Sequence, residues 1–242
     1  MSTFVLVHGA LHGGWCWYKV AAALRAQGHT VFTPDLPGLG VNRTATSSVS
    51  LQLYTDHLSD VIAQTEENVH LVGHSMGGIA ITQTAEAIPQ KIKTLTYLTA
   101  FLLPNGETVL DHVQSDTDSK TASALTPSSD NLSVTIDFDT ARNLFFADCS
   151  GEDLALAQSL LVPQALAPMM TPVQTTQERW GRIPRAYIEC SNDQAISPAL
   201  QRAMHKKLPC EKVMQLSTSH SPFFSAPEQV VKYLLSWSAC HE

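Results

Sequence analysis

The chain has 242 residues, 44% of them hydrophobic and 15% charged, with a formal net charge of −7. That length suits one domain, or one domain that carries an inserted subdomain. Lysine and arginine are scattered along the chain, which argues against nucleic acid and against anionic membranes as partners, because both attract basic patches.

The N-terminal region predicts neither a signal peptide nor a membrane span. Its apolar run, Phe-Val-Leu-Val at residues 4–7, is too short for either, and no basic stretch precedes it. The cysteines are odd in number and lack C-x-x-C spacing, which favours reduced thiols and a cytoplasmic location. They are Cys16, Cys149, Cys190, Cys210 and Cys240.

Short apolar runs alternate with helical patterns along most of the chain. This alternation predicts the fold class as α/β, a mainly parallel, doubly wound sheet with helices on both faces. Near-continuous apolar runs such as residues 4–7 fit central parallel strands, which are buried on both faces. The predicted strands are residues 3–7, 30–33, 69–72, 95–98, 185–189 and 212–216.

Helices are expected between these strands, and several have boundary signals. Gly28 follows the first helix in the position where a left-handed C-terminal residue is common. Ser197-Pro198 forms an N-cap and first-turn pair, and Ser225 with Glu228 predicts a capping box before the last helix. The predicted helices are residues 17–27, 51–62, 76–88, 197–207 and a last one ending near residue 237.

Residues 102–181 break the alternation and are too many for a loop. We predict a helical cap inserted into a core made of residues 1–101 and 182–242. An apolar pocket is expected between this cap and the strand ends, where open α/β sheets bind ligands. The two methionines and the paired phenylalanines of the cap favour an adaptable wall and broad specificity. The candidate pocket residues are Leu11, Leu102, Phe145, Phe146, Leu160, Leu161, Met169 and Phe223.

The motif Gly-His-Ser-Met-Gly at residues 73–77 follows a predicted strand and precedes a predicted helix. In that context G-x-S-x-G forms a tight, strained turn that projects the serine Oγ above the sheet. The start of the helix offers unpaired N–H groups and the positive end of the helix dipole. We predict Ser75 as a nucleophile and the Met76 N–H as an oxyanion donor. The alternative is a glycine-rich turn of another α/β fold.

A second motif, His-Gly-Ala-Leu-His-Gly-Gly-Trp at residues 8–15, follows the first strand. It places a flexible backbone beside the serine turn, and we assign the Ala10 N–H as the second oxyanion donor. The alternative is a purely structural glycine loop. His8 and His12 are expected to orient this loop rather than to act as acid or base.

Two late strands are followed by candidates for the remaining catalytic groups. Asp193 comes after the strand at 185–189, and His220 comes after the strand at 212–216, so both are expected at the same sheet edge as Ser75. His220 would act as the base and Asp193 would orient its imidazole. Glu189 is the rival acid but lies within a strand, and Asp193 as an ordinary turn residue is the alternative. Neither zinc-ligand spacing nor a phosphate-binding loop is present, so no metal or cofactor is expected.

These motifs resemble one branch of the α/β-hydrolases: the plant methylesterases and hydroxynitrile lyases, with their microbial, pyrethroid-hydrolase-like carboxylesterase relatives. The resemblance is carried by residues 4–17, 73–77 and 187–193 and by His220, and it is weakest in the cap. It implies an eight-stranded sheet and a cofactor-free Ser-His-Asp mechanism. The pattern above yields six strands, so the other two would be short or lie in the cap.

Three functions follow from these observations. The first is a serine carboxylesterase acting on small apolar esters, the second a hydroxynitrile lyase, and the third a non-catalytic ligand receptor. The lyases that the chain resembles carry threonine after the first-strand histidine and lysine after the catalytic histidine. Here these positions are Gly9 and Ser221, which favours the esterase. A small-molecule ester is the expected partner, and a homodimer is allowed by the sequence.

Overall fold

The computed structural model describes residues 1–241, so Glu242, the last residue of the expected core, lies outside the described part. Six strands form the main sheet in the order β2-β1-β3-β4-β8-β9, and every neighbouring pair is parallel. All the predicted strands are confirmed, and β3 and β4 run further toward the site than expected. Their bounds are β1 (Thr3–Val7), β2 (Thr30–Phe32), β3 (Val69–Ser75), β4 (Ile92–Ala100), β8 (Arg185–Cys190) and β9 (Lys212–Leu216).

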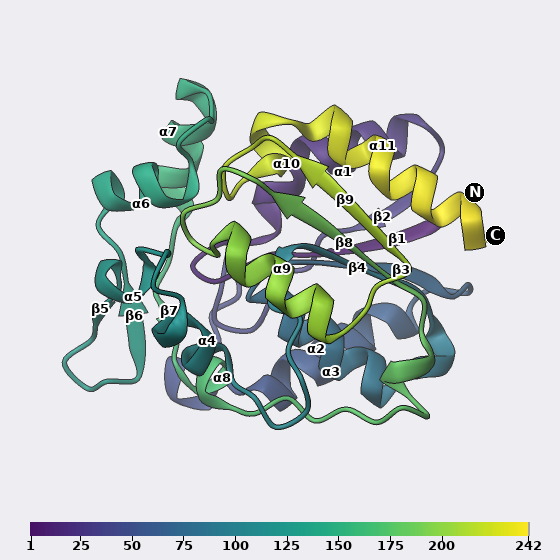
Figure 1. Ribbon diagram of the computed structural model, residues 1–242, viewed down its shortest axis with the longest axis horizontal. Helices are drawn as coiled ribbons and strands as arrows, with labels where there is room; N and C mark the ends of the chain where they lie inside the picture. The colour runs from purple at the N-terminus through teal and green to yellow at the C-terminus, as the bar shows by residue number, and fades with distance from the viewer. Residues whose placement is uncertain (242) are drawn as a thin grey trace.

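Helices cover both faces of this sheet (Figure 1). Alternating residues of β1 explain the two cores: Phe4 and Leu6 pack on the side of α1 and α11, whereas Val5 and Val7 pack on the side of α2, α3 and α9. The doubly wound arrangement is therefore confirmed. These helices are α1 (Tyr18–Ala26), α2 (Leu51–Ala63), α3 (Gly77–Ala87), α9 (Pro198–Lys207) and α11 (Pro227–Ser238).

The segment between β4 and β8 lies beside the carboxyl ends of β8 and β9 (Figure 1). It contains helices, as expected, and also a small antiparallel sheet in the order β5-β6-β7. We keep residues 102–181 as the proposed extent of the cap. Its elements are α4 (Val109–Ser115), α5 (Thr121–Ala124), β5 (Thr126–Pro127), β6 (Ser133–Thr135), α6 (Phe138–Phe145), α7 (Gly151–Leu160), β7 (Gln164–Ala165) and α8 (Ala167–Met170).

The eight-stranded sheet implied by the resemblance is wrong for residues 1–241. The main sheet there has six strands, and the short strands of the cap pair only with one another. β5 and β7 have two residues each and run antiparallel to β6, so they do not extend the parallel sheet.

Two of the three predicted helix boundaries are confirmed. Gly28 has a φ of 85°, in the left-handed region, and the Ser197 Oγ accepts a hydrogen bond from the Leu200 N–H at 3.1 Å. The capping box at Ser225 is wrong. Ser225 instead ends the short helix α10 (Pro222–Ser225), and α11 is capped by Ala226 without a side-chain bond. Pro222 and Pro227 each begin a helix, which leaves Ser225 inside the first one.

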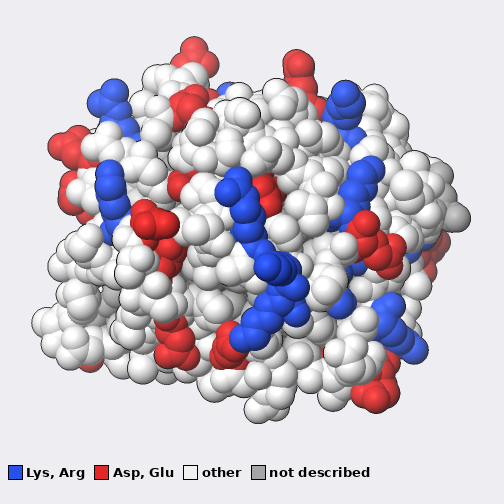
Figure 2. All heavy atoms as spheres, viewed as in Figure 1, with Lys and Arg blue, Asp and Glu red and all other residues white. Residues whose placement is uncertain are grey.

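Basic side chains form a short row over α9 on the face shown in Figure 2, with acidic side chains beside them. Two of the basic residues of α9 are paired: Arg202 lies 3.4 Å from Glu189, and Lys207 lies 2.6 Å from Glu107. The row is therefore partly neutralised. Among residues 1–241, no helix combines the length and the apolar character that crossing a bilayer requires.

Candidate active site

Ser75 lies at the end of β3, two residues before α3 begins. Its φ is 53°, a left-handed conformation that residues with side chains rarely adopt. Strand and helix approach closely here, since a Cβ on Gly77 would lie 2.6 Å from the His8 carbonyl oxygen. The turn therefore has the strained strand-to-helix geometry that the motif predicts.

Ser75, His220 and Asp193 form one hydrogen-bonded chain. The Ser75 Oγ lies 3.0 Å from the His220 Nε2, and the His220 Nδ1 lies 2.7 Å from the Asp193 Oδ2. The side chains come from the last residue of β3 and from the turns after β8 and β9. All three residues are buried, with 9% of Ser75 exposed. This arrangement lets the imidazole accept the serine proton while the carboxylate holds the opposite ring nitrogen.

The Asp193 carboxylate is held by several donors besides His220. Its Oδ1 accepts hydrogen bonds from the Ala195 and Ile196 N–H groups, at 2.7 and 3.0 Å. Its Oδ2 accepts one from the Thr99 hydroxyl at 2.5 Å. These bonds hold the carboxylate in one orientation.

Glu189, the rival acid, faces away from this chain of residues. It contacts the His205 Nε2 at 2.6 Å and the Gln215 amide at 3.4 Å. Both partners lie on α9 or β9. Of the two acids, Asp193 is therefore the one that is hydrogen-bonded to His220.

Ala10 and Met76 follow the neighbouring strands β1 and β3, and both line the same cavity as Ser75. Met76 is the N-cap residue of α3, so its N–H belongs to the group of helix-start donors. A Cβ on Gly9 would lie 2.8 Å from the Ser75 Cβ. Only glycine lets the loop before Ala10 come this close to the nucleophile.

His8 and His12 both orient backbone, as expected. The His8 Nε2 accepts a hydrogen bond from the Leu36 N–H at 3.0 Å, and its Nδ1 donates to the Gly9 carbonyl at 2.8 Å. The His12 Nδ1 donates to the Ala10 carbonyl at 2.7 Å. Burial lowers the pKa of His8 to about 4 and the pKa of His12 to about 3, so both rings are neutral at pH 7.

Three positioning residues were not predicted from the sequence: Thr99, His74 and Asp148. The His74 Nε2 donates to the His220 carbonyl at 2.8 Å, and its ring centre lies 4.6 Å from that of His220. Burial holds the pKa of His74 well below its ordinary value. Asp148, in the cap, accepts hydrogen bonds from the N–H and hydroxyl of Ser219, next to His220. His74 occupies the variable position between the glycine and the serine of the G-x-S-x-G motif, and this position was the sequence signal that could have pointed to it.

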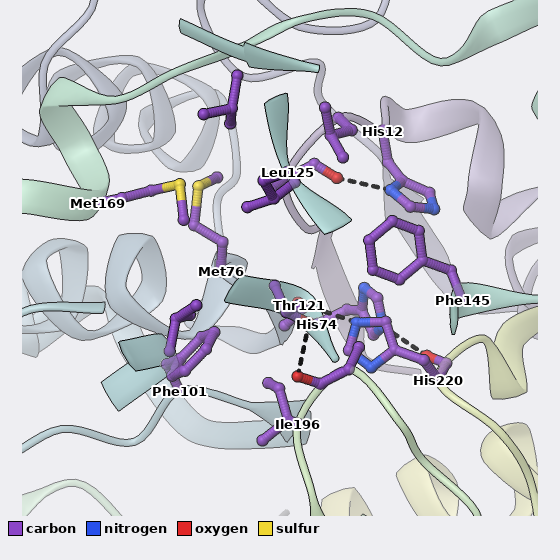
Figure 3. Close-up of a pocket in the computed structure, with 16 residues that line it drawn as sticks. His12, His74, Met76, Phe101, Thr121, Leu125, Phe145, Met169, Ile196 and His220 are labelled. Carbon is purple, nitrogen blue, oxygen red and sulfur yellow. Dashed lines mark hydrogen bonds between the residues drawn. The ribbon is translucent and has the colours of Figure 1, made fainter. Parts of the chain in front are cut away.

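An apolar cavity opens onto Ser75 between the cap and the strand ends (Figure 3). The volume of the cavity, including its open mouth, is about 510 Å³. None of its lining residues is an aspartate, glutamate, lysine or arginine. The cavity therefore suits an uncharged, apolar substrate. The lining residues that lie beyond the candidate triad and the oxyanion donors are Leu11, His12, His74, Phe101, Val113, Thr121, Leu125, Val134, Phe145, Met169, Ala195 and Ile196.

Three of the eight candidate pocket residues line this cavity: Leu11, Phe145 and Met169. The structure places the other five elsewhere, because most of them complete the packing of the core or of the cap. Leu102 and Phe223 are fully buried in the two cores, and Phe146 packs on His12 and Phe224. Leu161 borders a separate hollow with Leu11, and Leu160 is the half-buried last residue of α7.

Within residues 1–241, no three histidine, cysteine, aspartate or glutamate side chains gather as metal ligands would.

Comparison with known proteins identifies the family. The model of the "Alpha/beta hydrolase family" matches residues 4–233. The chain belongs to the α/β hydrolase family. Methylesterase 2 of Arabidopsis thaliana is 34% identical over 253 residues, covering 96% of this chain and 94% of the relative. The pyrethroid hydrolase of Sphingobium wenxiniae is 32% identical over 250 residues, covering 98% of this chain and 88% of the relative.

This α/β hydrolase also matches five putative chloroplastic methylesterases of Arabidopsis thaliana at 34% to 36% identity, but it spans only 56% to 71% of their length. Among solved structures, a mutant of tomato Methylketone Synthase I superimposes with a TM-score of 0.90 at 27% identity, covering 100% of this chain and 99% of that chain. The branch expected from the sequence motifs is thereby confirmed, together with the fold.

Proposed function

We propose that the chain is a serine carboxylesterase that hydrolyses small apolar carboxylic esters. The observation that carries the proposal is the buried Ser75–His220–Asp193 chain at the floor of an uncharged cavity. The similarity to proteins named methylesterase and pyrethroid hydrolase supports the same reaction class.

In the first half of the reaction, the Ser75 Oγ attacks the ester carbonyl while the His220 Nε2 takes the hydroxyl proton. Asp193 stabilises the imidazolium through the Nδ1–H. The oxyanion is bound by the N–H groups of Ala10 and Met76, and losing one such donor typically lowers the rate by about 10²–10³. The imidazolium then protonates the leaving alcohol, which departs and leaves an acyl group on Ser75.

In the second half, His220 removes a proton from water, which attacks the acyl carbonyl. The carboxylic acid leaves and Ser75 regains its proton from the imidazolium. Water and ester are the only reactants, so the proposal requires no cofactor. The apolar cavity excludes other water and strengthens these hydrogen bonds.

Cyanohydrin cleavage by the same three residues is the second candidate, and two positions argue against it. No side chain fits at Gly9, since its Cβ would lie 2.8 Å from that of Ser75. The threonine that the hydroxynitrile lyases carry at this position is therefore excluded here. Ser221, which replaces their lysine, is fully buried and supplies no charge.

The experiment is to incubate the purified chain with a p-nitrophenyl ester and, in parallel, with mandelonitrile at mildly acid pH. The proposal predicts ester turnover that Ser75→Ala abolishes. Benzaldehyde release that depends on Ser75, without ester turnover, would establish the lyase instead. Binding of either compound without turnover would establish the receptor.

Two further expectations belong to this proposal. The cytoplasmic location rests on cysteines that are all free in the described part of the chain, whereas five relatives are named chloroplastic. The homodimer remains a hypothesis, which the molecular mass measured in solution by light scattering tests.

A further inference from the structure

A second apolar hollow lies directly behind one wall of the catalytic cavity. Four residues, Val113, Leu125, Val134 and Met169, line both spaces. They come from α4, the end of α5, β6 and α8. The two hollows are therefore separated by a single layer of cap side chains, which are aliphatic or a flexible thioether.

We call this outer hollow the cap vestibule. With its mouth it holds about 650 Å³. None of its lining residues is charged, and Gln114 is the polar one among them. Besides the four shared residues, they are Leu110, Gln114, Ala122, Pro127, Leu166 and Met170. Met170 is 55% exposed, so the vestibule opens to solvent on its outer side.

We propose that the cap vestibule binds the far end of a long acyl chain whose ester carbonyl lies at Ser75. The inference rests on the proposed function and extends its substrates from small apolar esters to esters of medium- to long-chain, or similarly extended, apolar acids. The two hollows adjoin at the shared wall, so an acyl chain longer than the inner cavity meets this wall first. This is why we infer an acyl chain as the occupant. Leu125 is only half-buried, and Met169 can change rotamer, so the wall can part around a hydrocarbon chain.

The position of the shared wall indicates that the acyl chain of the ester, rather than its alcohol, reaches the cap vestibule. The leaving oxygen must lie at the His220 Nε2, because that nitrogen supplies its proton. Figure 3 shows Met169 on the opposite side of the cavity from His220, with Met76 and Leu125 between them. The acyl substituent of the tetrahedral adduct therefore points toward the wall, and the alcohol points toward His220.

The test measures kcat/KM for p-nitrophenyl esters from acetate to decanoate, below the concentrations at which they form micelles. A second series varies the alcohol of alkyl acetates. Each methylene buried in the vestibule should raise kcat/KM by up to about fourfold. The proposal predicts a rise along the acyl series and little change along the alcohol series.

Two variants fill the vestibule without touching the inner cavity: Ala122→Phe and Met170→Trp. Both native residues are exposed, so neither variant is expected to unfold the chain, which circular dichroism checks. Each should lower the ratio of decanoate to acetate kcat/KM by about tenfold or more. Ala155→Phe, on the exposed surface of α7 and away from both hollows, is the matched control and should keep the wild-type ratio.

The outcomes separate this inference from the proposed function. If acetate is hydrolysed through Ser75 but the two variants keep the wild-type chain-length profile, the vestibule is not an acyl site. A preference that appears in the alcohol series instead assigns the hollow to the leaving group and overturns the proposal. If no ester of either series is hydrolysed, the proposed function fails and the acyl site falls with it.

Discussion

His220 lies next to the carboxylate of Asp193 at 2.7 Å, whereas Glu189, the other acid near this sheet edge, faces His205. Asp193→Asn removes the charge that stabilises the imidazolium and can reverse the tautomer of His220. We expect kcat to fall by about 10⁴, the size known for this change in a serine triad. The measurement is steady-state kinetics with a p-nitrophenyl ester.

Glu189→Gln is the matched control, because it makes the same chemical change at a buried acid in the same strand region. It should keep kcat within a few-fold of wild type, although it weakens the contact with His205 and lowers stability. Strong inactivation by Glu189→Gln with an active Asp193→Asn would move the orienting role to Glu189.

The residues that perform the proposed chemistry were predictable because each follows a strand or a motif with a known geometry. Ser75, Asp193 and His220 were placed by their position at the carboxyl ends of β3, β8 and β9. Thr99 and Asp148 were not predicted, since each acts only through a neighbour that folding brings close. Thr99 contacts Asp193 from 94 positions away in the sequence, and Asp148 contacts Ser219 from 71 positions away.

At the scale of elements, the turn between α6 and α7 ties the cap to the loop that carries His220. Asp148 accepts the Ser219 N–H at 2.8 Å and also the Ser219 hydroxyl. Hydrogen bonds to a charged acceptor are worth about 1.5–3 kcal/mol. Asp148→Ala should therefore loosen the loop and lower kcat by about tenfold, with little change in KM for a small ester.

Asp139→Ala is the control for this prediction. Asp139 is an exposed acid in the first turn of α6. Its replacement by alanine removes one negative charge from the cap, as Asp148→Ala does, without touching the loop that carries His220. Equal kcat values for the two variants and the wild type would show that the cap does not position His220.

The cap was also where sequence reasoning reached least far. Periodicity separates buried from exposed residues, but it does not tell a core residue from a pocket residue. Leu102 and Phe223 are as apolar as Leu11 and Phe145, yet the first two fill the cores and the last two line the cavity. The capping box at Ser225 failed for a related reason, because two prolines five positions apart start two helices where one was expected.

At the scale of the whole molecule, three buried neutral histidines make stability depend on pH. Burial lowers the pKa of His8 to about 4, of His12 to about 3 and of His74 well below its ordinary value of 6.5. In the unfolded chain these rings take up protons as the pH falls below 6.5, while in the folded chain they do not. Stability is therefore complete above this pH and falls as the pH decreases, until the folded rings themselves protonate.

We expect each such histidine to remove about 2 kcal/mol of unfolding free energy between about pH 7 and about pH 5. Urea unfolding followed by fluorescence at several pH values measures this slope. A His12→Gln variant, whatever its overall stability, should lose one histidine's share of it. An unfolding free energy that stays constant over this range would contradict the burial of the three neutral rings.

The central claim is that Ser75 forms a covalent acyl intermediate, and one measurement tests it directly. The purified chain is mixed with p-nitrophenyl acetate, quenched in acid during the first turnover, digested, and analysed by mass spectrometry. The account predicts one acetyl group on the peptide that contains Ser75, and none in Ser75→Ala with an unchanged circular dichroism spectrum. An acetyl group on another residue that is required for turnover, or ester hydrolysis by Ser75→Ala above about a tenth of the wild-type rate, would contradict it.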